Sequence, residues 1–97
     1  MLTSKQRSFL RGKANAIDSI FQVGKGGISE NLIKQLDDAL EARELIKIHI
    51  LPSAQTEKKE LCRDLAKELS AEEVQLIGNR LVLYRKSVDN PRIELPY

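Results

Sequence analysis

The sequence predicts an α+β fold of two layers, in which three helices pack around one four-stranded mixed sheet. The observations behind this are three segments with apolar residues at helical spacing, two short β-prone segments between them, and two closing strands around a tight turn. Strand–helix–strand units favour parallel neighbours, whereas a hairpin pairs antiparallel. At 97 residues we expect one domain over residues 1–86 and a loosely ordered tail over residues 87–97.

The first two predicted elements are a helix and a short strand. Thr3 and Gln6 have the spacing of a capping box, which opens a helix. Gly12 weakens this helix by roughly 1 kcal/mol relative to alanine, so it either permits a close neighbour or is simply tolerated. Residues 19–23 are β-prone and predict the first strand. The pattern does not say where the first helix packs.

A second helix and a second strand follow. Ser29 is a suitable N-cap, and apolar residues at helical spacing predict a helix that runs to about Arg43. Residues 45–51 alternate, with isoleucines on one side and Lys47 and His49 on the other. This alternation predicts a strand with one buried face and one polar face.

The last three elements are a helix and a hairpin. Thr56 can cap a third helix that ends near Ser70. Residues 74–77 and 81–85 are strands joined by a turn at Gly78 and Asn79. The two crossover helices are expected to cover one face of the sheet and to leave the other face at least partly open.

Composition narrows the class of protein. Apolar residues make up 41% and charged residues 31% of the chain, as in a soluble globular protein. No apolar run approaches the roughly 18 residues that a membrane span requires, and the first residues lack the apolar core of a secretory signal. Cys62 is the only cysteine, which excludes an internal disulfide and a cysteine metal cluster. We expect a cytoplasmic protein, monomeric when free.

Charge is distributed unevenly along the chain. Residues 1–28 carry a net charge of +4, residues 29–78 carry −4, and residues 79–97 carry +2. If the two basic ends meet in the fold, they make one positive face. Ordinary surface charge is the alternative interpretation.

A glycine-rich loop is the strongest candidate site. Gly24, Lys25, Gly26 and Gly27 stand between the first predicted strand and the second helix. Such a loop can point backbone N–H groups at an anion, the helix N-terminus adds its dipole, and the lysine adds a charge. The anion would be a phosphate. A plain strand-to-helix connector is the alternative, and the spacing fits neither a Walker loop nor a dinucleotide fingerprint.

Further basic residues could extend a phosphate-binding surface. These are Arg7, Arg11, Lys47, Arg80, Arg85 and Lys86. Arg7 and Arg11 could equally form a solvated helix face, and Arg85 and Lys86 could protect a sheet edge. Tyr84 is either a stacking platform for a base or a core residue.

The sequence contains no catalytic constellation. His49 is the only histidine and lacks patterned partners, so a polar strand position is the better interpretation. Cys62 lies on an apolar stripe and is expected to be a buried small hydrophobe. The pairs 37–38 and 72–73 are acidic but lack metal-loop spacing. We therefore expect no enzyme activity, no cofactor and no metal.

Four blocks of sequence occur in a specific order. They are residues 2–12 (LTSKQRSFLRG), 23–27 (VGKGG), 39–47 (ALEARELIK) and 78–85 (GNRLVLYR). Together they closely resemble the CRM (chloroplast RNA splicing and ribosome maturation) domain in its stand-alone bacterial form, the YhbY/YqeI type. The resemblance covers residues 2–86.

This resemblance implies a fold similar to the C-terminal domain of translation initiation factor three, with an added N-terminal helix. It also implies non-catalytic binding of RNA, namely large-subunit ribosomal RNA or a pre-ribosomal particle, and a role in ribosome assembly. The family's G-x-x-G loop falls on residues 24–27. KH-domain loops of this kind join two helices, so their base-reading geometry is not carried over. The alternative function is a protein-interaction adaptor that docks to ribosomal proteins through the open sheet face.

Overall fold

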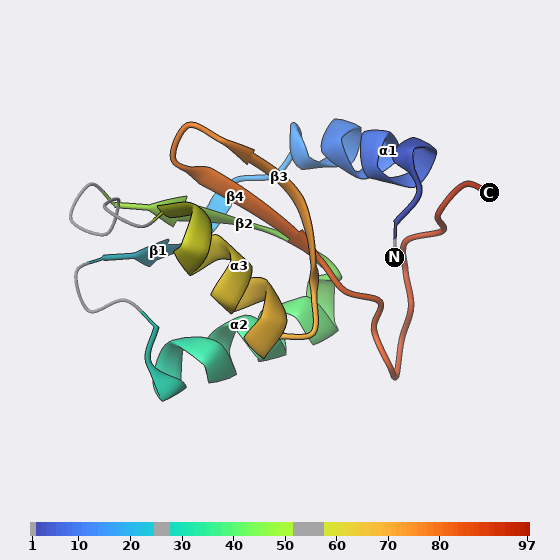
Figure 1. The fold of residues 1–97 in the computed structure, drawn as a ribbon. Coiled ribbons are helices and arrows are strands. Elements are labelled where there is room, and N and C mark those ends of the chain that lie inside the picture. The colour runs from blue at the N-terminus through green and yellow to red at the C-terminus, as the bar shows by residue number, and fades with distance from the viewer. Residues whose placement is uncertain (1, 25–27, 52–57) are drawn as a thin grey trace.

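The computed structural model describes residues 2–24, 28–51 and 58–97 and has the predicted α+β architecture of three helices and a four-stranded mixed sheet (Figure 1). Its elements are α1 (Ser4–Ala14), β1 (Ser19–Val23), α2 (Glu30–Arg43), β2 (Leu45–Ile50), α3 (Lys58–Glu68), β3 (Glu72–Ile77) and β4 (Arg80–Tyr84). The sheet order is β1-β2-β4-β3, with β1 parallel to β2 and the other pairs antiparallel. The predicted element order and mixed sheet are confirmed.

The predicted helix caps within the described residues are confirmed. The Thr3 hydroxyl accepts the N–H of Gln6 at 3.1 Å, and the Gln6 side chain accepts the N–H of Thr3 at 3.0 Å. This reciprocal pair is a complete capping box. Ser29 caps α2 by accepting the N–H of Leu32 at 3.1 Å. The proposed cap Thr56 lies outside the described residues.

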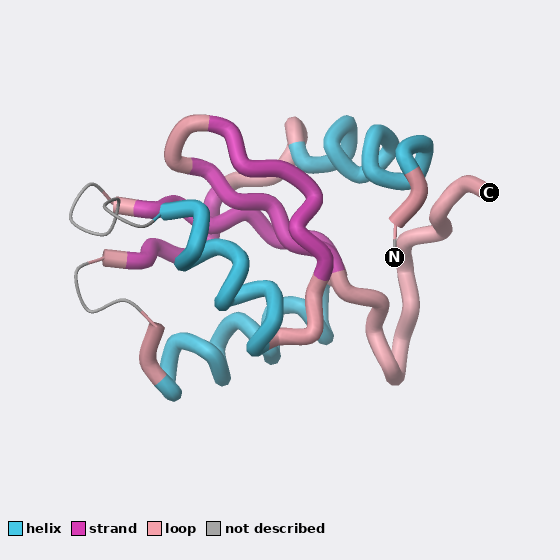
Figure 2. Tube along the Cα trace, viewed as in Figure 1, coloured by secondary structure: helices cyan, strands magenta, loops and turns pink. Residues whose placement is uncertain are grey.

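Helices α2 and α3 cover one face of the sheet, as predicted (Figure 2). Ile46, Ile48 and Ile50 of β2 point to this face and are fully buried. They pack with Leu81 and Leu83 of β4 and with the apolar stripes of both helices. This is the main core, and its burial of aliphatic side chains is the principal source of stability.

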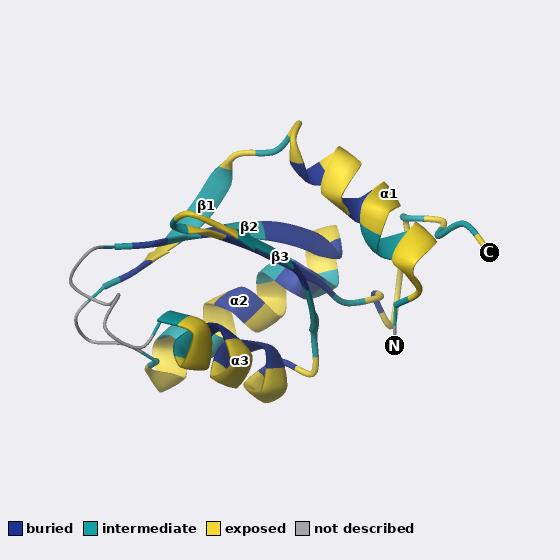
Figure 3. Cartoon of the chain, turned by 45° about the horizontal axis from the view of Figure 1, so that its top comes forward, coloured by how far each residue is buried: buried dark blue, intermediate teal, exposed yellow. Residues whose placement is uncertain are grey.

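Helix α1 crosses part of the opposite face, which answers the question that the sequence pattern left open (Figure 3). Leu10 and Ala14 of α1 pack on Leu45, Val82 and Tyr84 in a second, smaller core. Tyr84 is only 6% exposed. It is therefore a core residue rather than a platform for stacking bases.

The tail after β4 has no regular secondary structure, but a buried carboxylate holds part of it. Glu44, the residue after α2, accepts the backbone N–H groups of Ser87, Arg92 and Ile93 at 2.8, 2.6 and 2.7 Å. Both Glu44 and Ser87 are buried. No pattern in the sequence predicts these contacts within residues 87–97.

Gly12 lies in α1 with open space around it. A β-carbon built there would meet nothing within 4 Å, so no close neighbour requires a glycine. We predict that Gly12→Ala stabilises the protein by about 0.5–1 kcal/mol, because alanine loses less backbone entropy in a helix. Urea denaturation followed by circular dichroism measures this difference. A destabilised Gly12→Ala variant would contradict the tolerated-glycine interpretation.

Candidate nucleic-acid interface

Helix α1 leaves half of the second sheet face uncovered, and polar side chains lie there beside the exposed Ile77, which pairs with Arg80. We call this surface the open half and define it by Gln22, Lys47, His49, Gln75 and Arg80. Gln22 pairs with His49, and His49 pairs with Arg80 across neighbouring strands. Lys47 and Gln75 both pair with Val82, whose side chain lies on the same face as α1.

The open half carries two permanent positive charges and no negative charge. Within the part of the chain that the structure describes, neither Lys47 nor Arg80 forms an ion pair with a carboxylate. His49 adds a ring that donates or accepts hydrogen bonds, and the two glutamines add amides. Such a surface suits a polyanion with exposed polar edges.

The end of β1 that leads to Gly24 lies at the same end of the sheet as the β3–β4 hairpin. The N–H of Ile50 donates to the carbonyl of Asn79 at 2.7 Å, and the N–H of Leu51 donates to the carbonyl of Val23 at 2.8 Å. In Figure 1 these ends lie on the side of the molecule away from both chain termini. Gly24 is therefore placed near Arg80, whereas Lys25, Gly26 and Gly27 lie outside the described residues.

Lys58 is a cation at this end that sequence reasoning missed. Its Nζ donates to the carbonyl of Gly78 in the hairpin at 2.7 Å. Lys58 is the first residue of α3, and no motif in the sequence singles it out. Only the packing of α3 against the sheet brings it to the hairpin.

Arg7 and Arg85 are predicted site residues whose guanidinium groups hold the fold together. The Arg7 group donates to the carbonyls of Glu73 and Val74 and so ties α1 to β3. The Arg85 group pairs with the Asp37 carboxylate at 2.6 Å and donates to the carbonyl of Leu69 at 2.9 Å. Contact of either arginine with RNA would compete with these bonds.

Arg11 and Lys86 are exposed but lie apart from the open half. Arg11 belongs to α1, and Lys86 follows the end of β4 that is opposite Arg80. The structure thus places Arg80 and Gly24 at one end of the sheet and Lys86 at the other, and Lys47 pairs with Ser19 at the start of β1.

The two basic ends of the chain lie side by side in the fold. The charge pattern predicts a shared positive face only if these ends meet. The Gln6 amide donates to the carbonyl of Pro96 at 3.0 Å. Ile93 and Leu95 pack against the smaller core beside α1. The meeting of the ends does not by itself make one basic face, because Arg80 and Lys86 lie at opposite ends of β4.

The described residues give little support to a reactive thiol, a metal site or a membrane span. Burial, with a smaller contribution from the Glu73 charge, raises the pKa of Cys62 to about 11, so its thiol stays protonated at neutral pH. In the same residues no three His, Cys, Asp or Glu side chains are placed to hold a metal ion. No described helix is both long and apolar enough to cross a membrane.

A model of the CRS1/YhbY (CRM) domain matches residues 2–85. The chain belongs to this family. A relative from Bacillus subtilis, "Probable RNA-binding protein YqeI", is 51% identical to this CRM domain over 96 residues, which are 99% of this chain and 100% of the relative. A Haemophilus influenzae relative named "RNA-binding protein" is 34% identical and is matched over 98% of this chain and 95% of its own length.

A solved structure resembles this CRM domain throughout. The solution structure of the hypothetical protein SAV1595 from Staphylococcus aureus aligns with a TM-score of 0.82 and 55% identity. The alignment covers 99% of this chain and 100% of the other. The family resemblance drawn from the four sequence blocks is thereby confirmed.

Proposed function

We propose that this CRM domain is a non-catalytic RNA-binding protein that associates with precursor large ribosomal subunits during their assembly. The observation that carries the proposal is the open half, where Lys47 and Arg80 lack acidic partners among the described residues. The names of two relatives matched along nearly their whole length support RNA as the polyanion.

In this proposal the loop at residues 24–27 and the N-terminus of α2 hold backbone phosphates. A glycine-rich loop can present backbone N–H groups to an anion, the helix dipole favours negative charge there, and Lys25 would add a charged contact. Lys47 and Arg80 continue the positive surface across the open half. Phosphate contacts position the RNA without reading its sequence, so specificity comes from RNA shape or from unpaired bases.

Charge reversal at Lys25 tests the loop. We predict that Lys25→Glu weakens binding of a large-subunit ribosomal RNA fragment roughly tenfold, because a phosphate contact becomes repulsive. Fluorescence anisotropy measures the affinity, and the thermal midpoint should stay within about 2 °C of the parent value, as for a surface substitution. Lys67→Glu, an exposed site on α3, is the matched control and should bind normally. Normal binding by Lys25→Glu would make the loop a mere connector.

The cellular partner is tested separately by crosslinking in cells followed by RNA sequencing. Reads should concentrate on precursor large-subunit RNA. RNase treatment of isolated particles should release the protein if RNA holds it. Retention after RNase would instead favour an adaptor docked to ribosomal protein. That role would use an exposed apolar patch, yet the exposed large apolar residues Phe9, Ile77, Val88 and Tyr97 are spread over α1, β3 and the tail.

A further inference from the structure

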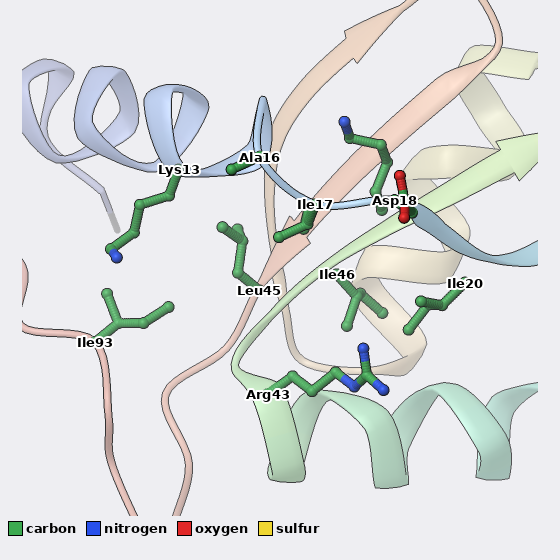
Figure 4. Close-up of a pocket in the computed structure, with 10 residues that line it drawn as sticks. Lys13, Ala16, Ile17, Asp18, Ile20, Arg43, Leu45, Ile46 and Ile93 are labelled. Atoms are coloured by element: carbon green, nitrogen blue, oxygen red, sulfur yellow. The ribbon is translucent and has the colours of Figure 1, made fainter.

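A cavity lies where the end of α1, the start of β1, the junction of α2 with β2 and the tail come together (Figure 4). Its volume of about 550 Å³ is within the range of roughly 300–1,000 Å³ typical of small-molecule sites. The cavity is separate from the glycine loop, because it adjoins Asp18 and Ile20 at the start of β1, whereas Gly24 follows the end of that strand.

The walls of the cavity are aliphatic. Ile17, Ile20 and Ile93 are each only half-buried, so part of their apolar surface faces water. Leu45 and Ile46 form the deeper wall and are almost fully buried. A flat organic group placed here would remove this apolar surface from water, which is favourable.

The rim of the cavity is positively charged. Lys13, Arg43 and Lys47 line it together with a single carboxylate, that of Asp18. Across the described segments, no ion pair neutralises Arg43 or Lys47. Lys13 lies over the Phe9 ring at 5.6 Å from the centroid, and Figure 4 shows it facing Ile93 across one side. The rim therefore favours an anionic ligand over a neutral or cationic one.

We infer that this cavity holds one unpaired nucleotide of the RNA, with the base on the aliphatic walls and its phosphates at the rim cations. The inference rests on the proposed function. A nucleotide combines the two properties that the cavity selects, a flat ring with apolar faces and a negative charge. Arg43 suits both parts, because a guanidinium group stacks on a base or binds a phosphate in bidentate fashion.

The position of β1 connects this cavity to the glycine loop. β1 is an edge strand of five residues, or about 16 Å at 3.3 Å per residue. Lys47 belongs to both the cavity rim and the open half. An RNA strand that leaves the cavity can therefore follow β1 past Gln22 to Gly24 without crossing an acidic element.

Methyl NMR on isoleucine-labelled protein tests the inference directly. Adenosine monophosphate and a single-stranded RNA hexamer should shift the methyl signals of Ile17, Ile20 and Ile93, with nuclear Overhauser contacts to base protons. The methyl of Ile33 on α2, outside the cavity, should stay in place. Ribose 5-phosphate should cause much smaller shifts, because it has no base.

The outcomes separate this inference from the proposed function. If the hexamer binds and shifts the Gly24 and Arg80 amides but not the cavity methyls, the nucleotide site is wrong and RNA binding stands. Equal shifts with ribose 5-phosphate would reduce the site to a phosphate contact and overturn the base pocket. Shifts only with an acidic, apolar peptide would identify a protein ligand instead. Absence of any RNA binding would remove both proposals.

A charge variant gives an independent measure. Arg43→Glu should weaken binding of the single-stranded hexamer roughly tenfold, because it removes a stacking and phosphate contact and adds a repulsive charge. Binding of a fully paired RNA of equal length should change less than threefold. Arg63→Glu on the exposed side of α3 is the control. An equal loss for both RNAs would show a general electrostatic effect and contradict a site for an unpaired base.

Discussion

Glu44→Gln is expected to destabilise the protein by roughly 2–4 kcal/mol, because it removes one acceptor that buried N–H groups need. Glu44 is fully buried and accepts three backbone N–H groups of the tail. Glutamine keeps one oxygen but presents an NH₂ group in place of the other, so at least one tail N–H loses its partner. Urea denaturation at neutral pH measures the loss.

Two glycine variants separate the effect of losing the Glu44 carboxylate from the effect of relieving backbone strain. Glu44 has φ +66° and Ser70 has φ +53°, both in the left-handed region that favours glycine. Ser70→Gly should stabilise the protein by up to about 1 kcal/mol, because it relieves this strain. Glu44→Gly should destabilise it, because the lost carboxylate outweighs the relieved backbone. If both variants stabilise, Glu44 is only a helix cap and the tail contacts contribute little.

The contribution of Glu44 depends on pH with a definite sign. Burial alone would raise the pKa of Glu44, but the N–H donors of Ser87, Arg92 and Ile93 outweigh it and leave the pKa below the ordinary value of 4.5. Glu41 has its pKa lowered by the Ser87 hydroxyl first and then by the N–H groups of Val88 and Asp89. A carboxylate with a lowered pKa stabilises the fold above its unfolded pKa, and that stability is lost as pH falls through the folded value.

The pH dependence of stability provides a second test of the Glu44→Gln variant. The difference in stability between the parent protein and Glu44→Gln should be full at pH 7 and should shrink as pH falls below about 4.5. In the parent protein, hydrogen exchange at the amides of Arg92 and Ile93 should speed up over the same acidic range. A difference that is constant from pH 7 to pH 3 would mean that the ionised carboxylate does not hold the tail.

RNA affinity is expected to fall roughly 100-fold between 50 and 200 mM salt if the protein makes about five phosphate contacts with single-stranded RNA. Each neutralised phosphate releases a counterion, so the logarithm of the affinity falls linearly with the logarithm of the salt concentration. Anisotropy titrations at four or more salt concentrations give the slope. A flat response would count against phosphate binding as the main source of affinity.

The slope of affinity against salt concentration also shows which residues make the phosphate contacts. Lys47→Gln and Arg80→Gln should each weaken binding at low salt and reduce the slope by up to about one unit. Arg63→Gln and Lys67→Gln, which change exposed cations on α3, should leave the slope unchanged. An equal reduction from the α3 variants would mean that the net charge, rather than the open half, sets the affinity.

Much of the fold and part of the candidate site could be predicted from local pattern. The capping box at Thr3, the N-cap at Ser29 and the alternation around Lys47 act between residues close in the chain, so their signals are visible in sequence. Lys47 could be chosen as a site residue for the same reason, because it alternates with buried isoleucines on β2, and Arg80 could be chosen because it flanks the predicted hairpin turn. The family could also be identified, because its blocks are contiguous.

Sequence alone therefore determined the order of the elements, the buried face of β2 and membership of the CRM family. Only the tertiary structure decided the sheet order β1-β2-β4-β3, the position of α1 over half of the second face, and the internal bonds of Arg7 and Arg85. It also decided that Glu44 holds the tail, through partners more than 40 residues away. The physical reason is the distance along the chain between the contacting groups. Periodicity shows which side of a helix or strand is buried, but it does not show which distant group packs against that side.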